Sequence, residues 1–215
     1  MKTMASYLIR FLVSTSLLMM MQTAIAQDHA EDLVKKGITA ARLGYLEDAL
    51  SCFQKAIYLD PTLPEAWFNR GILYYESGDH VKALIDLNRA AQLRPRQSEI
   101  FLRRGLVHHA LSEDSLAVND LQRALQLDSL YTEARFNLGL IYYQQNDFEK
   151  AFRQFDRILH YEPENARALY QRGLCNHFLG KFFLAIADFD ASFQLSPGDA
   201  DILLSRGVSK ALAER

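Results

Sequence analysis

The chain has 215 residues, of which 49% are hydrophobic and 23% are charged, and its formal net charge is −2 at pH 7. A weakly acidic balance lacks the clustered positive charge with which proteins bind the nucleic-acid backbone. We therefore expect no nucleic-acid partner.

The first 26 residues have the layout of a secretory signal peptide. Lys2 and Arg10 precede a mostly apolar, uncharged run at residues 11–21, and the small residues Ala24 and Ala26 follow it. The pattern predicts cleavage after Ala26 and export, to the periplasm in preference to the extracellular space. The alternative is an uncleaved anchor or an interfacial helix. Because no later stretch is apolar over the length of a bilayer, we expect no transmembrane segment in residues 27–215.

Glycine recurs every 34 residues through the rest of the chain, at Gly37, Gly71, Gly105, Gly139, Gly173 and Gly207. A fixed period of this length indicates one supersecondary unit that is copied and stacked. Seven residues after the first five glycines stand Gly44, Gly78, Ser112, Asn146 and Gly180, and further on stand Pro61, Pro95, Ser129, Pro163 and Pro197. Left-handed residues close helices and proline does not continue them, so each unit should be helix, tight turn, helix and break.

Small and large apolar residues also keep the register of the glycines. Alanine follows by twelve residues and a large apolar residue by sixteen, the latter being Phe53, Leu87, Leu121, Phe155 and Phe189. Small residues let two helices approach closely, and the apolar spacing is helical. The domain at residues 27–215 should be an all-α solenoid of five helix-turn-helix units, at 30–63, 64–97, 98–131, 132–165 and 166–199. We expect residues 200–215 to form a capping helix, with Lys210 on its polar outer face.

The fourth unit carries a fuller form of the pattern, with Leu138, Gly139, Tyr142, Ala151, Phe155 and Pro163, and the second unit supplies Trp67, Gly71, Tyr74, Ala83 and Pro95. These residues resemble the tetratricopeptide repeat, in which W-x2-L-G-x2-Y, A-x3-F and P recur on a 34-residue period. The resemblance covers residues 30–215. It implies a right-handed α-solenoid whose first helices line a concave, partner-binding groove.

Arginine and aspartate vary together at two positions of the repeat. The second, third and fifth units carry both residues, whereas the first and fourth carry neither. We expect ion pairs between the two helices of one unit, joining Arg70 to Asp86, Arg104 to Asp120, and Arg172 to Asp188. The alternative is that the arginines bind an anion, although a matched aspartate already satisfies each charge.

The partner-binding face should lie on the first helices, at the positions three before, one after and four after each glycine, which share a helix face. The candidate groove residues are Phe68, Tyr75, His109, Phe136, Tyr143, Tyr170 and His177. We expect the side chains four residues after the glycine to be exposed, and these are Tyr75, His109, Tyr143 and His177. For Phe68, Phe136 and Tyr170, packing between neighbouring units is an open alternative. An aromatic lining suits an extended or helical segment that inserts side chains, and it argues against capture of a terminal carboxylate.

No motif for catalysis, cofactor binding or metal binding accompanies the repeats. His109 and His177 lie two units apart, too far to bind one metal ion. No glycine-rich phosphate loop follows a predicted strand. Cys52 and Cys175 lie more than three units apart, so we expect free, buried thiols, with an intermolecular disulfide as the alternative. We expect a binding protein without a cofactor, and not an enzyme.

The sequence thus predicts an exported protein-interaction module, a scaffold or assembly factor that binds a protein or peptide segment in its concave groove. A second hypothesis is that the groove aromatics bind cell-wall glycan or a small apolar ligand. Self-association through the ends of the array is also open, because stacked repeats can expose apolar ends.

Overall fold

The computed structural model describes residues 15, 20, 21 and 26–214. The predicted signal peptide, residues 1–26, lies outside the described residues except at positions 15, 20, 21 and 26. The chain divides into two compact units, one that ends at Arg96 and one that begins at Gln97. Every regular element among the described residues is an α-helix, and none of these helices combines the length and apolar character that a membrane crossing requires.

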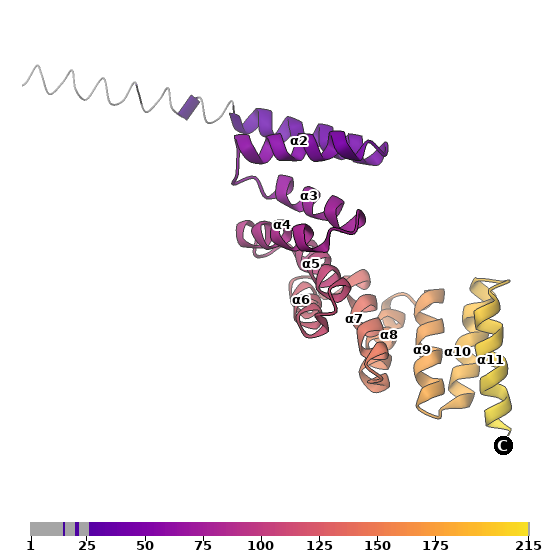
Figure 1. Cartoon of the computed structure of the whole chain (residues 1–215). Helices are drawn as coiled ribbons and strands as arrows, with labels where there is room; N and C mark the ends of the chain where they lie inside the picture. Colours follow the sequence, from indigo (N-terminus) through magenta and orange to yellow (C-terminus); the bar gives the residue numbers. More distant parts are fainter. Residues whose placement is uncertain (1–14, 16–19, 22–25, 215) are drawn as a thin grey trace, which may run out of the picture. The chain divides into compact units, whose positions relative to one another are not determined.

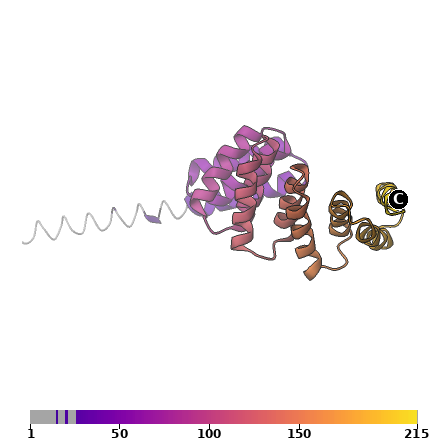
Figure 2. The same ribbon diagram turned by 90° about the horizontal axis from the view of Figure 1, so that it is seen from below.

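Helical hairpins follow one another through both units (Figure 1). The N-terminal unit contains a helix at residues 26–42, then α2 (Leu46–Leu59), α3 (Pro64–Glu76) and α4 (His80–Leu93). The C-terminal unit contains α5 (Ser98–Ala110), α6 (Asp114–Leu127), α7 (Thr132–Gln144), α8 (Phe148–Tyr161), α9 (Ala166–Phe178), α10 (Phe182–Leu195) and α11 (Ala200–Ala213). Short turns join them (Figure 2). The even-numbered helices are the second helices of the hairpins, and α11 follows the fifth hairpin.

Each hairpin turns on one residue in the left-handed region of backbone conformation. The φ angles are 82° at Gly44, 83° at Gly78, 63° at Ser112, 60° at Asn146 and 72° at Gly180. In the turn after α3, the N–H of Gly78 donates to the Tyr75 carbonyl at 3.0 Å, and the N–H of Asp79 donates to the Tyr74 carbonyl at 2.8 Å. These bonds satisfy carbonyl groups that the end of the helix leaves unpaired. The predicted position of the turn is confirmed in all five hairpins.

The two helices of a hairpin come closest at the periodic glycine. A Cβ atom on Gly139 would lie 2.7 Å from Phe155 Cζ, and one on Gly173 would lie 2.7 Å from Phe189 Cε1. Both phenylalanines are fully buried, at 0% exposure. Contacts this short are closer than van der Waals packing permits, so the register requires glycine at these positions.

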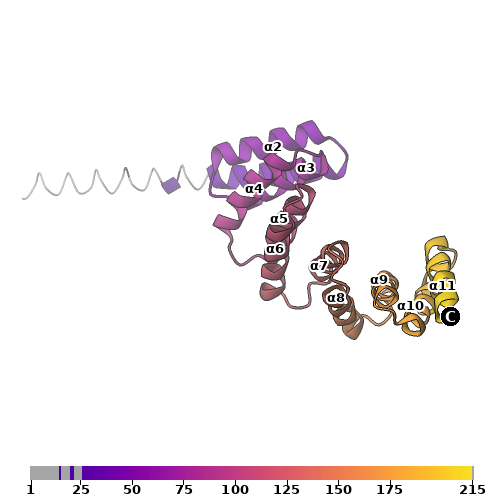
Figure 3. The same ribbon diagram turned by 60° about the horizontal axis from the view of Figure 1, so that its bottom comes forward.

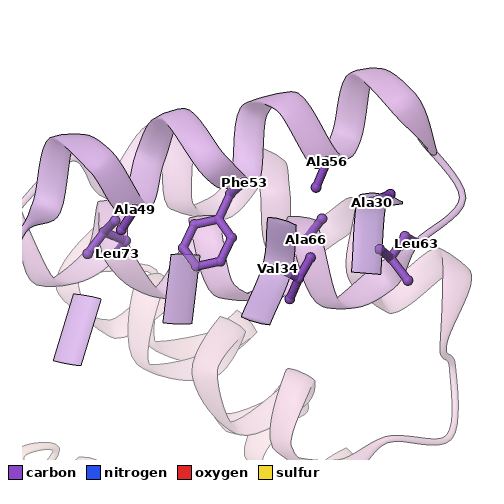
Figure 4. Packing of buried hydrophobic residues seen from close by; sticks show 8 residues of the cluster. All are labelled: Ala30, Val34, Ala49, Phe53, Ala56, Leu63, Ala66 and Leu73. Atoms are coloured by element: carbon purple, nitrogen blue, oxygen red, sulfur yellow. The ribbon is translucent and has the colours of Figure 1, made fainter. Parts of the chain in front are cut away.

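The core of the first hairpin is built from small residues around one phenylalanine (Figure 4). Phe53 is 1% exposed, and it occupies the space beside Gly37, whose Cβ would lie 2.6 Å from Phe53 Cε1. Ala49 and Ala56, one turn to either side on α2, are both fully buried. Ala66 of α3 joins the same cluster, so this core continues into the second hairpin.

Ion pairs connect the two helices of the second, third and fifth hairpins. Each arginine donates twice to its aspartate, at 2.7 and 2.9 Å for Arg70 and Asp86, 2.7 and 2.6 Å for Arg104 and Asp120, and 3.1 and 2.6 Å for Arg172 and Asp188. The aspartates are at most 6% exposed. Arg172 also donates from Nη1 to Asp156 of α8 at 2.7 Å. A bidentate guanidinium therefore compensates each buried carboxylate.

The helix α11 repeats the first-helix pattern, but among the described residues no second helix packs against its glycine. A Cβ atom on Gly207 would have no neighbour within 4 Å. The other side of α11 packs on α10 (Figure 3). Lys210 is exposed, as expected for the end of the array. Leu204 and Val208 are also exposed, at 68% and 45%, so the outer surface of α11 is more apolar than predicted.

Two alanine substitutions test the packing at the glycines. Gly139→Ala should lower the free energy of unfolding by about 1–3 kcal/mol, because Phe155 has no space into which to move. Gly207→Ala should raise it by up to about 1 kcal/mol, because the site is open and alanine favours the helix. The measurement is the thermal or urea midpoint followed by circular dichroism. Equal shifts for the two variants would contradict this account.

Candidate functional site

The seven candidate groove residues all lie on first helices. Helix α3 carries Phe68 and Tyr75, α5 carries His109, α7 carries Phe136 and Tyr143, and α9 carries Tyr170 and His177. Five of the seven therefore belong to the C-terminal unit, where α7, α9 and their second helices form adjacent hairpins.

The candidate groove side chains are less exposed to solvent than expected for the lining of a partner-binding groove. Phe68 is 9% exposed and Phe136 is 8% exposed. Both rings are therefore packed, which was the alternative left open for them. Phe136 lies edge-on to Phe155 with 5.4 Å between ring centroids, and the Arg167 guanidinium lies 4.4 Å from the Phe136 centroid. Five of the candidates are half-buried, namely Tyr75, His109, Tyr143, Tyr170 and His177. All of these except Tyr170 were expected to be exposed. Neighbouring side chains cover part of each.

Phe136 and Tyr170 line a hollow of about 220 Å³ at the N-terminal ends of α7 and α9. Leu140 and Ile202 extend its apolar wall, and Arg167 lies at its polar side. Pockets that enclose small molecules measure about 300–1,000 Å³. The smaller volume here suits one inserted side chain.

Tyr143 and His177 belong to a group of five rings at the opposite ends of the same helices, which we call the aromatic cluster. Phe148 and Phe178 stack with 4.7 Å between centroids and 10° between planes, and Tyr143 lies edge-on to both at 5.5 and 5.8 Å. His177 lies edge-on to Phe178 at 5.2 Å and to Phe182 at 5.6 Å. Phe178 is 54% exposed. The cluster is therefore held by its own ring contacts while it presents an aromatic surface to solvent.

The aromatic cluster uses a contact that recurs in four hairpins. The residue four after the glycine meets the first residue of the second helix, as in Tyr75 with His80, His109 with Asp114, Tyr143 with Phe148, and His177 with Phe182. The sequence analysis missed Phe148 and Phe182. A signal was present, because a ring stands opposite a ring in the second, fourth and fifth hairpins, and an aspartate stands opposite a histidine in the third.

Hydrogen bonds orient the histidines of this face. His109 Nδ1 lies 2.7 Å from Asp114 Oδ1, and His177 Nδ1 lies 2.8 Å from Ser209 Oγ in α11. In the part of the chain that the structure describes, no three His, Cys, Asp or Glu side chains are placed to hold a metal ion. What the face offers is contact surface, made of ring faces with positioned polar groups.

The N-terminal unit has its own hollow at the matching positions of the first hairpin. Its volume is about 470 Å³, and the apolar part of its lining consists of Val34, Ile38, Leu63 and Pro64. Lys35 also lines it, together with Glu65 and Arg94, which form an ion pair. This lining mixes both signs of charge and contains no aromatic residue, in contrast to the C-terminal unit.

Burial further favours the neutral forms of two polar groups of the C-terminal unit. It raises the pKa of the Tyr143 hydroxyl, and it raises the pKa of the Cys175 thiol to about 12. Both cysteines are free, with Cys175 buried and Cys52 half-buried. A protonated, buried thiol is a poor nucleophile, so Cys175 contributes packing to α9.

Family models described as tetratricopeptide repeat match residues 41–100, 138–207 and 102–159. The chain belongs to the tetratricopeptide repeat family. Repeats of this family stack into protein-interaction modules, and the helical-repeat fold of the two units agrees with that class.

Solved structures show the same fold at low sequence identity. YrrB, described as a tetratricopeptide repeat protein with an unusual peptide-binding site, is 24% identical with a TM-score of 0.71, over 81% of this chain and 90% of that chain. PilF of Pseudomonas aeruginosa is 18% identical with a TM-score of 0.77, over 88% and 86%. A tetratricopeptide repeat protein of Parabacteroides merdae is 22% identical with a TM-score of 0.75, over 87% and 74%.

Proposed function

We propose that this tetratricopeptide repeat protein is a scaffold or assembly factor that binds a segment of another protein, with the aromatic cluster as its anchor. The observation that carries the proposal is Phe178, which is half exposed although it stacks on Phe148 and contacts Tyr143 and His177. Rigid aromatic groups give a large contact area at low entropic cost, and they dominate many protein interfaces.

The hollow beside Phe136 and Tyr170 supplies a second point of contact for the same segment. Tyr143 follows Phe136 by seven residues, and His177 follows Tyr170 by seven, so both spacings correspond to about 10 Å along a helix. A partner would then insert two apolar side chains that far apart. They would be about three residues apart in an extended segment and about seven apart in a helical one.

The low exposure of Phe136 limits what this second contact can do. Its ring forms the floor of the hollow and is not itself the anchor, because Phe155 and Arg167 already pack against it. The exposed ring of Phe178 carries the larger share of the contact, so the proposal assigns the main loss of binding to that residue.

A matched pair of variants tests the anchor. Phe178→Ala should reduce capture of the partner from envelope fractions by about tenfold or more, because truncating an interface aromatic removes its buried contact area. Tyr161→Ala is the control, because Tyr161 is 52% exposed on α8 and outside the aromatic cluster. Capture is measured by quantitative mass spectrometry of the proteins retained on the immobilised chain. Equal retention by Phe178→Ala and Tyr161→Ala would rule out the anchor.

The same variants separate a protein partner from the alternative ligands. If the chain binds cell-wall glycan or a small apolar molecule through these rings, Phe178→Ala will reduce the binding of isolated wall material or of an apolar dye. In that case no protein will be retained in stoichiometric amount. That result would replace the proposed partner class while keeping the site.

We also propose that the chain works outside the cytoplasm, in the periplasm. The support is the layout of residues 1–26, which begins with basic residues, continues with an apolar run and ends with small residues at 24 and 26. N-terminal sequencing of the protein purified from its native host should begin at Gln27. A chain that still begins at Met1 would contradict cleavage.

A further inference from the structure

The exposed side of α11 has the features that receive a second helix in the other hairpins. A Cβ atom added to any periodic glycine of the five preceding hairpins would lie within 3.2 Å of a Phe or Leu side chain of the second helix. A Cβ atom added to Gly207 would have no neighbour within 4 Å. Leu203, four residues earlier, is 41% exposed, while its counterpart Leu169 in α9 is 6% exposed. The helix α10 packs against α9, and among the described residues no helix takes that place on α11.

A hollow of about 360 Å³ lies where the missing helix would pack. Phe183, Ile186 and Asp190 of α10 line one side, and Arg206, Lys210 and Ala213 of α11, with Glu214 directly after it, line the other. The repeat register aligns Asp190 with Asp156, Arg206 with Arg172, and Lys210 with Asn176. In the fifth hairpin, Arg172 and Asn176 contact Asp188 of α10.

Arg206 makes fewer hydrogen bonds to carboxylates than Arg172, its counterpart in the fifth hairpin. In the fifth hairpin, Arg172 donates from Nη1 to Asp156 and from Nε and Nη2 to Asp188, and Asn176 donates to Asp188 at 2.9 Å. Arg206 makes the first of these bonds, from Nη1 to Asp190 at 2.7 Å. Among the described residues, no acceptor for its Nε or Nη2 takes the place of Asp188.

The hollow and the exposed side of α11 therefore select both charge and shape. Arg206 favours a carboxylate, because the aligned Arg172 binds Asp188 through Nε and Nη2, the two donors that have no second-helix acceptor at Arg206 among the described residues. Gly207 leaves room for a large apolar side chain. In the chain's own second helices these two groups are consecutive residues, at Asp86–Leu87, Asp120–Leu121 and Asp188–Phe189, and a small residue precedes the aspartate by three positions at Ala83, Ala117 and Ala185.

We propose that α11 is a docking site for an amphipathic helix of another polypeptide, which carries the sequence Ala-x-x-Asp followed by Leu or Phe. The aspartate pairs with Arg206, and the Leu or Phe packs against Gly207. The bound helix completes a sixth hairpin in trans. This surface is separate from the aromatic cluster, so it gives the protein a second point of attachment at the end of the array.

The probe is a fluorescent peptide with the sequence of α6, residues 114–127, which contains Ala117, Asp120 and Leu121 in the required register. In this peptide Asn119→Glu and Arg123→Lys, both at positions exposed in α6, supply the carboxyl group and the amine of a side-chain lactam, which keeps the isolated peptide helical. Fluorescence anisotropy with the full chain should show saturable binding of one peptide per chain. Peptides with Asp120→Asn or Leu121→Ala should bind about tenfold more weakly or worse, because each loses one of the two recognised groups.

Variants of the protein locate the bound peptide. Gly207→Leu should abolish binding, because its side chain fills the space that the peptide leucine needs, and Arg206→Gln should weaken binding by about tenfold. Gly207→Leu should not lower the melting temperature, since the site is open and leucine favours the helix more than glycine does. Phe178→Ala should bind the peptide as the parent does, which distinguishes this surface from the aromatic cluster.

Three results would overturn the proposal. They are the absence of saturable binding at millimolar peptide, binding that Gly207→Leu leaves unchanged, and an unmodified chain that sediments as a dimer which Gly207→Leu converts to a monomer. In the last case a second copy of this chain, and not another polypeptide, occupies α11.

Discussion

The structure depends on the absence of a side chain at one position of every hairpin. At the periodic glycine the second helix comes so close that a single added carbon would overlap the ring of Phe53, Phe155 or Phe189. This contact sets the register between the two helices, and the turn residue with positive φ seven positions later brings the chain back in that register. The apolar positions of the second helix are then buried against the first, which fixes which surfaces remain for binding.

Two kinds of surface remain after the hairpins have packed. The first is the side of the first helices that bears the aromatic cluster, where rings pack on one another and Phe178 stays half exposed. The second is the exposed side of α11, which has the glycine and the arginine of a first helix but, among the described residues, no second helix packed on them. Both surfaces result from the same repeat, because the first lies along the first helices of the hairpins and the second lies on the exposed side of α11.

The period of the sequence was sufficient to predict the helices, the turns and the all-α class, because backbone constraints at Gly, Asn and Pro act locally and repeat without change. Accessibility was predicted less well. Phe136 satisfies the helical spacing of a groove residue, but Phe155 and Arg167, neither adjacent in sequence, cover its ring. Phe148 and Phe182 were missed because the face was assigned from the first helices alone, and the start of the second helix also reaches it. The prediction of a capping helix implied an open side at Gly207, but it expected a polar outer surface, and Leu204 and Val208 are exposed on the outer surface of α11.

A double-mutant cycle at Gly139 and Phe155 tests most directly whether this close contact governs the fold. The second hairpin has Leu87 at the equivalent position, where a Cβ atom on its glycine would have a nearest neighbour at 3.0 Å, against 2.7 Å at Phe155. Phe155→Leu should therefore cost less in the Gly139→Ala background than in the parent chain, with a coupling energy of about 1 kcal/mol or more in urea unfolding. Free energies that add within about 0.5 kcal/mol would show that the two residues do not constrain each other, and they would contradict the account.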